Sequence, residues 1–168
     1  NTLKFISWNL VDYSPKENVT EFEKVDQYIL ESLNLLVKNV TEDFDNYNFS
    51  DATSQIMTFM STDLSSFYLD INKDVLYCEG KDSLRRKQVQ TVLYQVGETL
   101  LRLLNPILPF TMDEFNNNMP GKRASNPQYY DYPKYHDVNE GVLKEYDNFK
   151  LLRDDVLKAL EDARNNKV

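Results

Sequence analysis

The sequence predicts an all-α fold: an antiparallel bundle of four to five helices, an irregular loop rich in proline and tyrosine, and a C-terminal helix. Two observations support this prediction. Glycine and proline, which interrupt helices, number only four and six among 168 residues. Apolar residues recur in steps of three and four over long stretches, which places them on one face of a helix. We therefore divide the chain into a bundle over 1–120, a connecting loop over 121–140 and a final helix over 141–168.

The first long helix is predicted over residues 21–47. Thr20 followed by Glu23 has the spacing of a capping box, so we expect the helix to begin there. A helix of about 27 residues would be roughly 40 Å long, which is typical of a bundle. Residues 1–11 are interpreted as the last turns of a preceding helix. The apolar face of the long helix consists of Phe22, Val25, Ile29, Leu33, Leu36, Val40, Phe44 and Tyr47.

A second helical segment follows, with Ser50 or Asp51 as its predicted N-cap and Gly80 as its terminator. Tyr68 lies off the apolar face of this segment, so its ring is expected at the surface. Cys78, near the end, is interpreted as a small buried residue. The apolar face consists of Ile56, Met60, Leu64, Phe67, Ile71 and Val75.

A third helix is predicted to start at 82–83 and to end near Pro106, because proline removes a donor and restricts the preceding residue. The spacing of Thr111 and Glu114 again matches a capping box, so a short helix should follow until Pro120. The apolar face of the third helix consists of Val89, Val92, Val96, Leu100, Leu103 and Ile107.

The stretch 120–137 holds three prolines and four tyrosines, and it is predicted to be an irregular connection lying over the bundle by its rings. The final helix should begin near Gly141. Its apolar residues are expected to face the core: Val142, Tyr146, Phe149, Leu152, Val156, Leu160 and Ala163.

Composition excludes most catalytic chemistries. One cysteine excludes an internal disulfide and a cysteine cluster for zinc, and one histidine excludes an all-histidine metal site. His136 lies in the proline-tyrosine loop with no nucleophile signature, and it is interpreted as an exposed loop histidine. Asp154 and Asp155 are adjacent on a helix and point about 100° apart, so they are interpreted as part of a solvated face. No stretch is long and apolar enough to span a membrane.

Charge is distributed unevenly along the chain. The net charge is −8, and positions 12–54 hold ten acidic against three basic residues. Positions 73–87 reverse this balance with five basic against three acidic residues. Arg85, Arg86 and Lys87 begin a helix, where the dipole attracts anions such as phosphate. The simpler alternative is an ordinary solvated face.

Aromatic residues add candidates for binding unpaired bases, which stack on exposed rings while cations hold the backbone. Tyr68 and Lys73 are close enough in sequence for their side chains to lie at the same edge of the bundle. Phe67 lies on the apolar face and is interpreted as core. Trp8 is a second candidate ring, with core or an interface to an upstream portion as alternatives. The candidate RNA-binding residues are therefore Trp8, Tyr68, Lys73, Arg85, Arg86 and Lys87.

Residues 63–70 read Asp-Leu-Ser-Ser-Phe-Tyr-Leu-Asp, and at the expected distance Asp-Ser-Leu-Arg-Arg follows at 82–86. The run Pro-Ile-Leu-Pro-Phe-Thr at 106–111, the opening Asn-Thr-Leu-Lys-Phe and the segment 152–164 belong to the same pattern. Together these motifs resemble the anticodon-binding helical domain of bacterial-type isoleucyl-tRNA synthetases, and the resemblance covers nearly the whole chain.

The resemblance implies a fragment of a class I synthetase that joins isoleucine to tRNA(Ile) through an adenylate formed from ATP and Mg²⁺. The HIGH and KMSKS motifs of the family's catalytic domain are absent from the sequence. A cysteine-ligated zinc module would follow the final helix. The resemblance therefore implies that this fragment is catalytically inactive and holds no cofactor. It also implies a cytoplasmic monomer that contacts a catalytic domain of the same polypeptide and no membrane.

Two alternatives stay open from the sequence. The chain could be a helical protein-interaction or scaffold module, which its acidic total favours. It could also be the equivalent domain of a valyl-, leucyl- or methionyl-tRNA synthetase, because those enzymes share the bundle and the Pro-x-x-Pro element.

Overall fold

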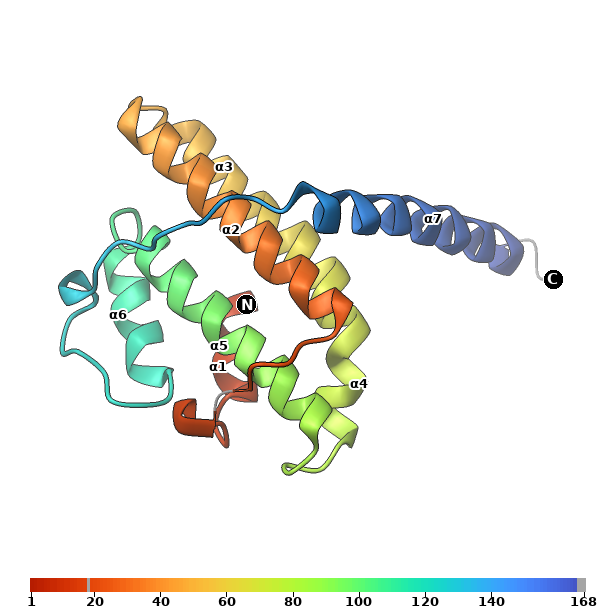
Figure 1. Cartoon of the computed structure of the whole chain (residues 1–168), viewed down its shortest axis with the longest axis horizontal. Helices are drawn as coiled ribbons and strands as arrows, with labels where there is room; N and C mark the ends of the chain where they lie inside the picture. Colours follow the sequence, from red (N-terminus) through yellow and green to blue (C-terminus); the bar gives the residue numbers. More distant parts are fainter. Residues whose placement is uncertain (18, 166–168) are drawn as a thin grey trace.

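The computed structural model describes residues 1–17 and 19–165, and this part of the chain is helical and contains no strand (Figure 1). The all-α prediction is therefore confirmed. Two single-turn 3₁₀ helices, η1 (Pro15–Glu17) and η3 (Pro127–Tyr129), lie in the connections. The remaining elements are α1 (Thr2–Asn9), α2 (Lys24–Asp45), α3 (Phe49–Thr58), the π-helix η2 (Phe59–Leu69), α4 (Asp70–Cys78), α5 (Leu84–Leu104), α6 (Pro109–Asn118) and α7 (Glu140–Asn165).

Helix α2 begins later than the capping-box spacing predicts. Glu23 is the N-cap, and its main-chain amide donates to the Asp26 carboxylate at 3.1 Å. Thr20 lies three residues outside the box that forms, so the predicted start is wrong. A carboxylate at the third helical position satisfies an otherwise unpaired amide and also favours the positive end of the helix dipole.

Helices α3 and α4 are joined through η2 without a break, so residues 49–78 form one rod. The π-helical segment has wider turns than an α-helix, and the hydroxyls of Ser65 and Ser66 donate to carbonyls five residues earlier. The wider turns shift the buried face away from the predicted stripe, so that Ile71 is 40% exposed. The buried side chains of η2 and α4 are Phe59, Leu64, Phe67, Tyr68, Leu69, Asn72 and Leu76.

Helix α5 is the central element and packs against α1, α2, α4 and α6. Ser83 is its N-cap and accepts from the amide of Arg86 at 3.4 Å, which confirms the predicted start. The short helix α6 starts at Pro109, and proline is favoured at the first position of a helix, where its missing amide costs nothing. The helix therefore begins before Thr111, and the capping box predicted there is wrong. Gly97 lets this part of the chain approach closely, because a Cβ there would lie 2.9 Å from the Met119 methyl.

The loop after α6 lies over the bundle as predicted, and Tyr130 is its main anchor. The guanidiniums of Arg102 and Arg123 lie 4.9 and 5.2 Å from the centroid of this ring. Its hydroxyl donates to Asn116 at 3.0 Å and accepts from the amide of Ala124 at 2.9 Å. Cation–π contacts and hydrogen bonds thus hold this irregular segment against the bundle.

Helix α7 extends away from the bundle (Figure 1). Two contacts anchor α7 to the bundle: Tyr146 stacks on Tyr28 with ring centroids 5.0 Å apart, and Arg153, near the middle of the helix, donates to Asp70 at 2.8 Å. None of its described side chains is buried, so the predicted core-facing stripe is wrong beyond this anchor. We call residues 152–165 distal α7; its exposed apolar residues are Leu152, Val156, Leu157 and Leu160. No helix in the described ranges combines the length and the hydropathy that a membrane span needs.

Candidate RNA-binding surface

Arg85 is the second residue of α5, and its guanidinium turns into the bundle. It donates to both carboxylate oxygens of Asp26, at 2.5 and 3.0 Å, and to the Asn72 side-chain oxygen at 2.7 Å. Asp26 is completely buried. A bidentate pair of this kind holds both charges in place within the fold. The predicted phosphate contact at Arg85 is therefore corrected: its charge is compensated inside the protein.

Tyr68 joins the same arrangement, which we call the Asp26 cluster (Asp26, Tyr68, Asn72 and Arg85). The Tyr68 side chain is 0% exposed, and its hydroxyl donates to Asp26 at 2.7 Å. Burial and the neighbouring Asp26 carboxylate raise the pKa of Tyr68 well above its ordinary value, so the phenol stays neutral and remains a donor. The prediction of an exposed stacking ring at Tyr68 is wrong, because the π-helical turns rotate it inward.

Replacing Tyr68 by phenylalanine should lower the free energy of unfolding by about 1.5–3 kcal/mol, because the buried carboxylate loses one donor. Urea unfolding followed by circular dichroism measures this change. Tyr129→Phe is the control, because Tyr129 is exposed and a change there should stay within about 0.5 kcal/mol. Equal effects of the two substitutions would contradict the buried hydrogen bond.

Arg86 is also compensated by an acidic side chain. It donates to the two carboxylate oxygens of Asp12, at 2.6 and 3.2 Å. This hydrogen bond from Arg86 lowers the pKa of Asp12. Gln90 adds a further donor to Asp12 at 2.8 Å. The second predicted phosphate contact is corrected in the same way as the first.

Lys87, Lys73 and Trp8 are the predicted residues that remain at or near the surface. Lys87 is half-buried and lines a small polar cavity of about 200 Å³ together with Lys81 and Asp82. Trp8 is exposed on α1. The six predicted residues thus do not form one binding surface. Lys73 and Lys87 line two different cavities, and Trp8 lies on another helix. The side chains of Tyr68, Arg85 and Arg86 are hydrogen-bonded to acidic residues of the protein.

Lys73 lines a groove between α1 and the η2–α4 rod. The volume of this groove is about 400 Å³, and sequence reasoning did not single out its most exposed ring, Tyr77. Tyr77 follows Lys73 by four residues, so the two side chains share one helix face. The spacing of four residues between a lysine and a tyrosine is the sequence pattern that could have indicated Tyr77. We call the site the Tyr77 groove; it is lined by Asn1, Thr2, Phe5, Ser65, Leu69, Asp70, Lys73 and Tyr77.

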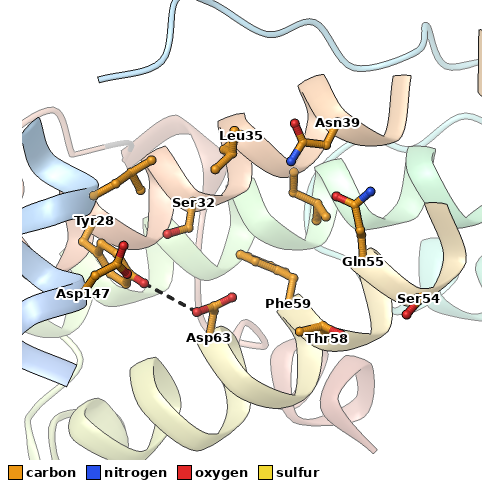
Figure 2. A pocket seen from close by; sticks show the side chains of 12 residues that line it. Tyr28, Ser32, Leu35, Asn39, Ser54, Gln55, Thr58, Phe59, Asp63 and Asp147 are labelled. Carbon is orange, nitrogen blue, oxygen red and sulfur yellow. Dashed lines mark hydrogen bonds between the residues drawn. The ribbon is translucent and has the colours of Figure 1, made fainter. Parts of the chain in front are cut away.

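A second groove of about 330 Å³ lies between α2, α3, η2 and the start of α7 (Figure 2). Figure 2 shows the carboxylates of Asp63 and Asp147 at one end of it, beside the ring of Tyr28. The Tyr28 hydroxyl donates to Asp63 at 3.5 Å, and Lys150 forms an ion pair with Asp63. Two carboxylates against one cation disfavour a phosphate here. The Tyr77 groove has one lining cation, Lys73, which forms an ion pair with the lining carboxylate of Asp70 at 3.0 Å.

Comparison with known proteins gives the same assignment as the sequence motifs. Residues 26–168 match the family described as the anticodon-binding domain of tRNA ligase. Isoleucine–tRNA ligases of Bacillus mycoides (strain KBAB4) and Bacillus cereus (strain B4264) are each 44% identical over 173 aligned residues, covering all of this chain and 19% of the relative. The chain thus spans about a fifth of the length of these relatives. With most of its residues matched, the chain belongs to the anticodon-binding domain family of tRNA ligases.

Proposed function

We propose that this chain recognises the anticodon arm of tRNA(Ile) as one region of an isoleucine–tRNA ligase. The observation that carries the proposal is the 44% identity across the entire chain to proteins of that name. The alternative assignment to a valyl, leucyl or methionyl enzyme is less well supported, because the relatives from B. mycoides and B. cereus both carry the isoleucine name.

The whole protein would join isoleucine to tRNA with ATP and Mg²⁺, and would carry zinc in a separate module. Within residues 1–17 and 19–165, no three His, Cys, Asp or Glu side chains gather where they could hold a metal ion. We assign to this chain a positioning role without catalysis, in a monomeric cytoplasmic enzyme.

The bundle suits such a role because rigid helices fix the position of a surface relative to the rest of an enzyme. Contacts to phosphates orient a nucleic acid, and contacts to bases then specify it. The net charge of −8 limits the number of phosphate contacts that this chain can make. We therefore expect shallow salt dependence, since the slope of log K against log salt scales with the number of phosphates neutralised.

Binding of a fluorescently labelled anticodon stem-loop of tRNA(Ile) to this chain tests the proposal. The control RNA has the same stem and a scrambled loop. We expect at least tenfold tighter binding of the true loop in anisotropy titrations at two salt concentrations. Equal affinity for both loops, or no binding of either, would contradict anticodon recognition by these residues.

A protein-interaction module remains the second candidate, and the exposed apolar residues of distal α7 favour it. Leu152, Val156 and Leu160 lie on one side of that helix and are more than half or about half exposed. The two functions differ in the loop-binding titration. Sedimentation of this chain alone adds a readout: concentration-dependent association lost in Leu152→Glu would favour a protein contact through α7.

A further inference from the structure

The groove between α2, α3, η2 and the start of α7, which we call the α2–α7 groove, has the size of a small-molecule site (Figure 2). Its volume of about 330 Å³ lies at the lower end of the roughly 300–1,000 Å³ that such sites occupy. We propose that this groove binds a small molecule with an ammonium head and an aliphatic body. The inference goes beyond anticodon recognition and does not depend on it.

The floor of the α2–α7 groove is apolar and fixed by the core. Phe59 is 3% exposed and Leu36 is 5% exposed, so packing holds both side chains in place before a ligand arrives. Leu35 of α2 and Leu143 of α7 add half-buried apolar walls. An alkyl chain that lies on these side chains leaves water, which favours an aliphatic body over a polar one.

The acidic end of the groove has oxygens that are open to a donor. Both donors that reach Asp63, the Tyr28 hydroxyl and the Lys150 ammonium, bind its Oδ1 atom. Nothing else in residues 1–17 and 19–165 donates to Asp63, and nothing there donates to Asp147. Figure 2 shows these two carboxylates at the same end of the groove. Three carboxylate oxygens therefore remain for the head of a ligand.

The charge at this end favours an organic ammonium over other heads. The two carboxylates exceed the Lys150 cation by one charge, and positions 12–54, which include all of α2, hold ten acidic against three basic residues. The surrounding field therefore attracts cations. A metal ion is disfavoured, because in the described part of the chain no third acidic, histidine or cysteine ligand joins this pair. An ammonium has three donors, so one head can bind both carboxylates while its chain lies on the apolar floor.

A ligand in this groove would connect α7 to the rest of the bundle. Leu143 and Asp147 belong to α7, whereas Leu36 belongs to α2 and Asp63 to η2. The groove is complete only while α7 is docked, so binding favours the docked arrangement by mass action. At a ligand concentration of ten times the dissociation constant, the undocked population should fall by about tenfold.

Hexylamine, which is protonated at neutral pH, is the probe for a first test on the ¹⁵N-labelled chain. We expect saturable amide shift changes confined to residues around the groove, with a dissociation constant of about 1 mM or below. Lengthening the chain from butylamine to hexylamine should tighten binding by up to about fourfold for each methylene that leaves water. Hexanol and hexanoate have the same chain without the ammonium, and they should bind at least about fivefold more weakly.

A carboxylate variant locates the head of the ligand. Asp147→Asn should weaken hexylamine binding by about three- to tenfold, because one charged acceptor becomes neutral. Asp155→Asn is the matched control, since this exposed aspartate lies on the same helix and lines no part of the groove, and affinity should stay within about twofold. Circular dichroism verifies that both variants keep their helix content.

Hydrogen exchange tests the connection to α7. At ten times the dissociation constant, hexylamine should slow exchange of the amides at 143–147 by about tenfold, and the same concentration should have little effect in Asp147→Asn. Unchanged exchange in the saturated original chain would overturn the bridging of α7.

Four results of the binding measurements would overturn the site itself. These are equal affinity for hexylamine and hexanol, shift changes spread over acidic surfaces elsewhere, equal losses in Asp147→Asn and Asp155→Asn, and absence of saturation. Tighter binding of Nα-acetyl-lysine methylamide than of hexylamine would assign the groove to a lysine of another protein and also overturn the small-molecule site. The RNA titrations measure anticodon recognition separately, so its failure and the failure of this inference are distinguishable.

Discussion

Replacing Arg85 by alanine is expected to lower the free energy of unfolding by about 3–5 kcal/mol, because it leaves the buried Asp26 carboxylate without its cation. Asp26 would keep only the Tyr68 hydroxyl and the main-chain amide of Glu23 as donors. The Asp26 cluster connects α2, η2, α4 and α5, so its loss should act on the whole bundle. Chemical denaturation at neutral pH measures the change.

A loss of this size is a large part of the stability of a typical domain, so the single variant can fail to fold. The double variant Asp26→Leu with Arg85→Met guards against that outcome. It removes both charges and fills similar space, and a buried pair replaced by apolar residues is often neutral or stabilising. The double variant should therefore be more stable than Arg85→Ala. Greater loss in the double variant than in Arg85→Ala would refute the view that an uncompensated charge dominates.

Replacing Phe67 by alanine is the second large effect, with an expected loss of about 3–5 kcal/mol. Phe67 is 3% exposed and meets Tyr28 edge to face, with centroids 5.7 Å apart. It also lies under α7: the Lys150 ammonium is 5.0 Å from its ring centroid and the Arg153 guanidinium 5.9 Å. Removing the ring therefore creates a cavity and weakens the anchor of α7.

Two measurements distinguish these consequences. Thermal unfolding reports the cavity, and hydrogen exchange reports opening of α7, whose amides should exchange faster in the variant. Phe110→Ala is the matched control, because Phe110 is 91% exposed and should change stability by no more than about 0.5 kcal/mol. Similar losses at the two positions, or unchanged exchange in α7, would contradict the packing described for Phe67.

Hydrophobic spacing is sufficient to predict the helices of this chain, because apolar side chains must share a face to enter one core. The steps of three and four before and after position 48 correspond to α2 and to the α3–α4 rod. Ends are less predictable, since several polar residues can satisfy the first amides of a helix. Thr20 has suitable spacing with Glu23, yet Glu23 and Asp26 form the box that caps α2.

The candidate site was less predictable, for two physical reasons. A π-helix changes the residues that face inward, so counting by 3.6 placed Tyr68 outside and Ile71 inside, and both assignments are reversed. Cys78 was likewise predicted to be buried and is exposed, because α4 ends there. Acidic partners distant in sequence also determine whether each basic side chain is free to bind a phosphate. Asp12 and Asp26 are 74 and 59 residues from Arg86 and Arg85, so local charge counts missed both pairs.

The π-helical segment also constrains how the length of this chain can vary. Each residue of an α-helix advances by about 100°, so deleting one residue between Phe59 and Leu69 would rotate everything after it by roughly that angle. Asn72 would leave its partner, and Tyr77 would point away from Phe5. Single-residue deletions should therefore be tolerated in the loop between α6 and α7 and rejected here. The integrity of this rod depends on the number of its residues as much as on their chemistry.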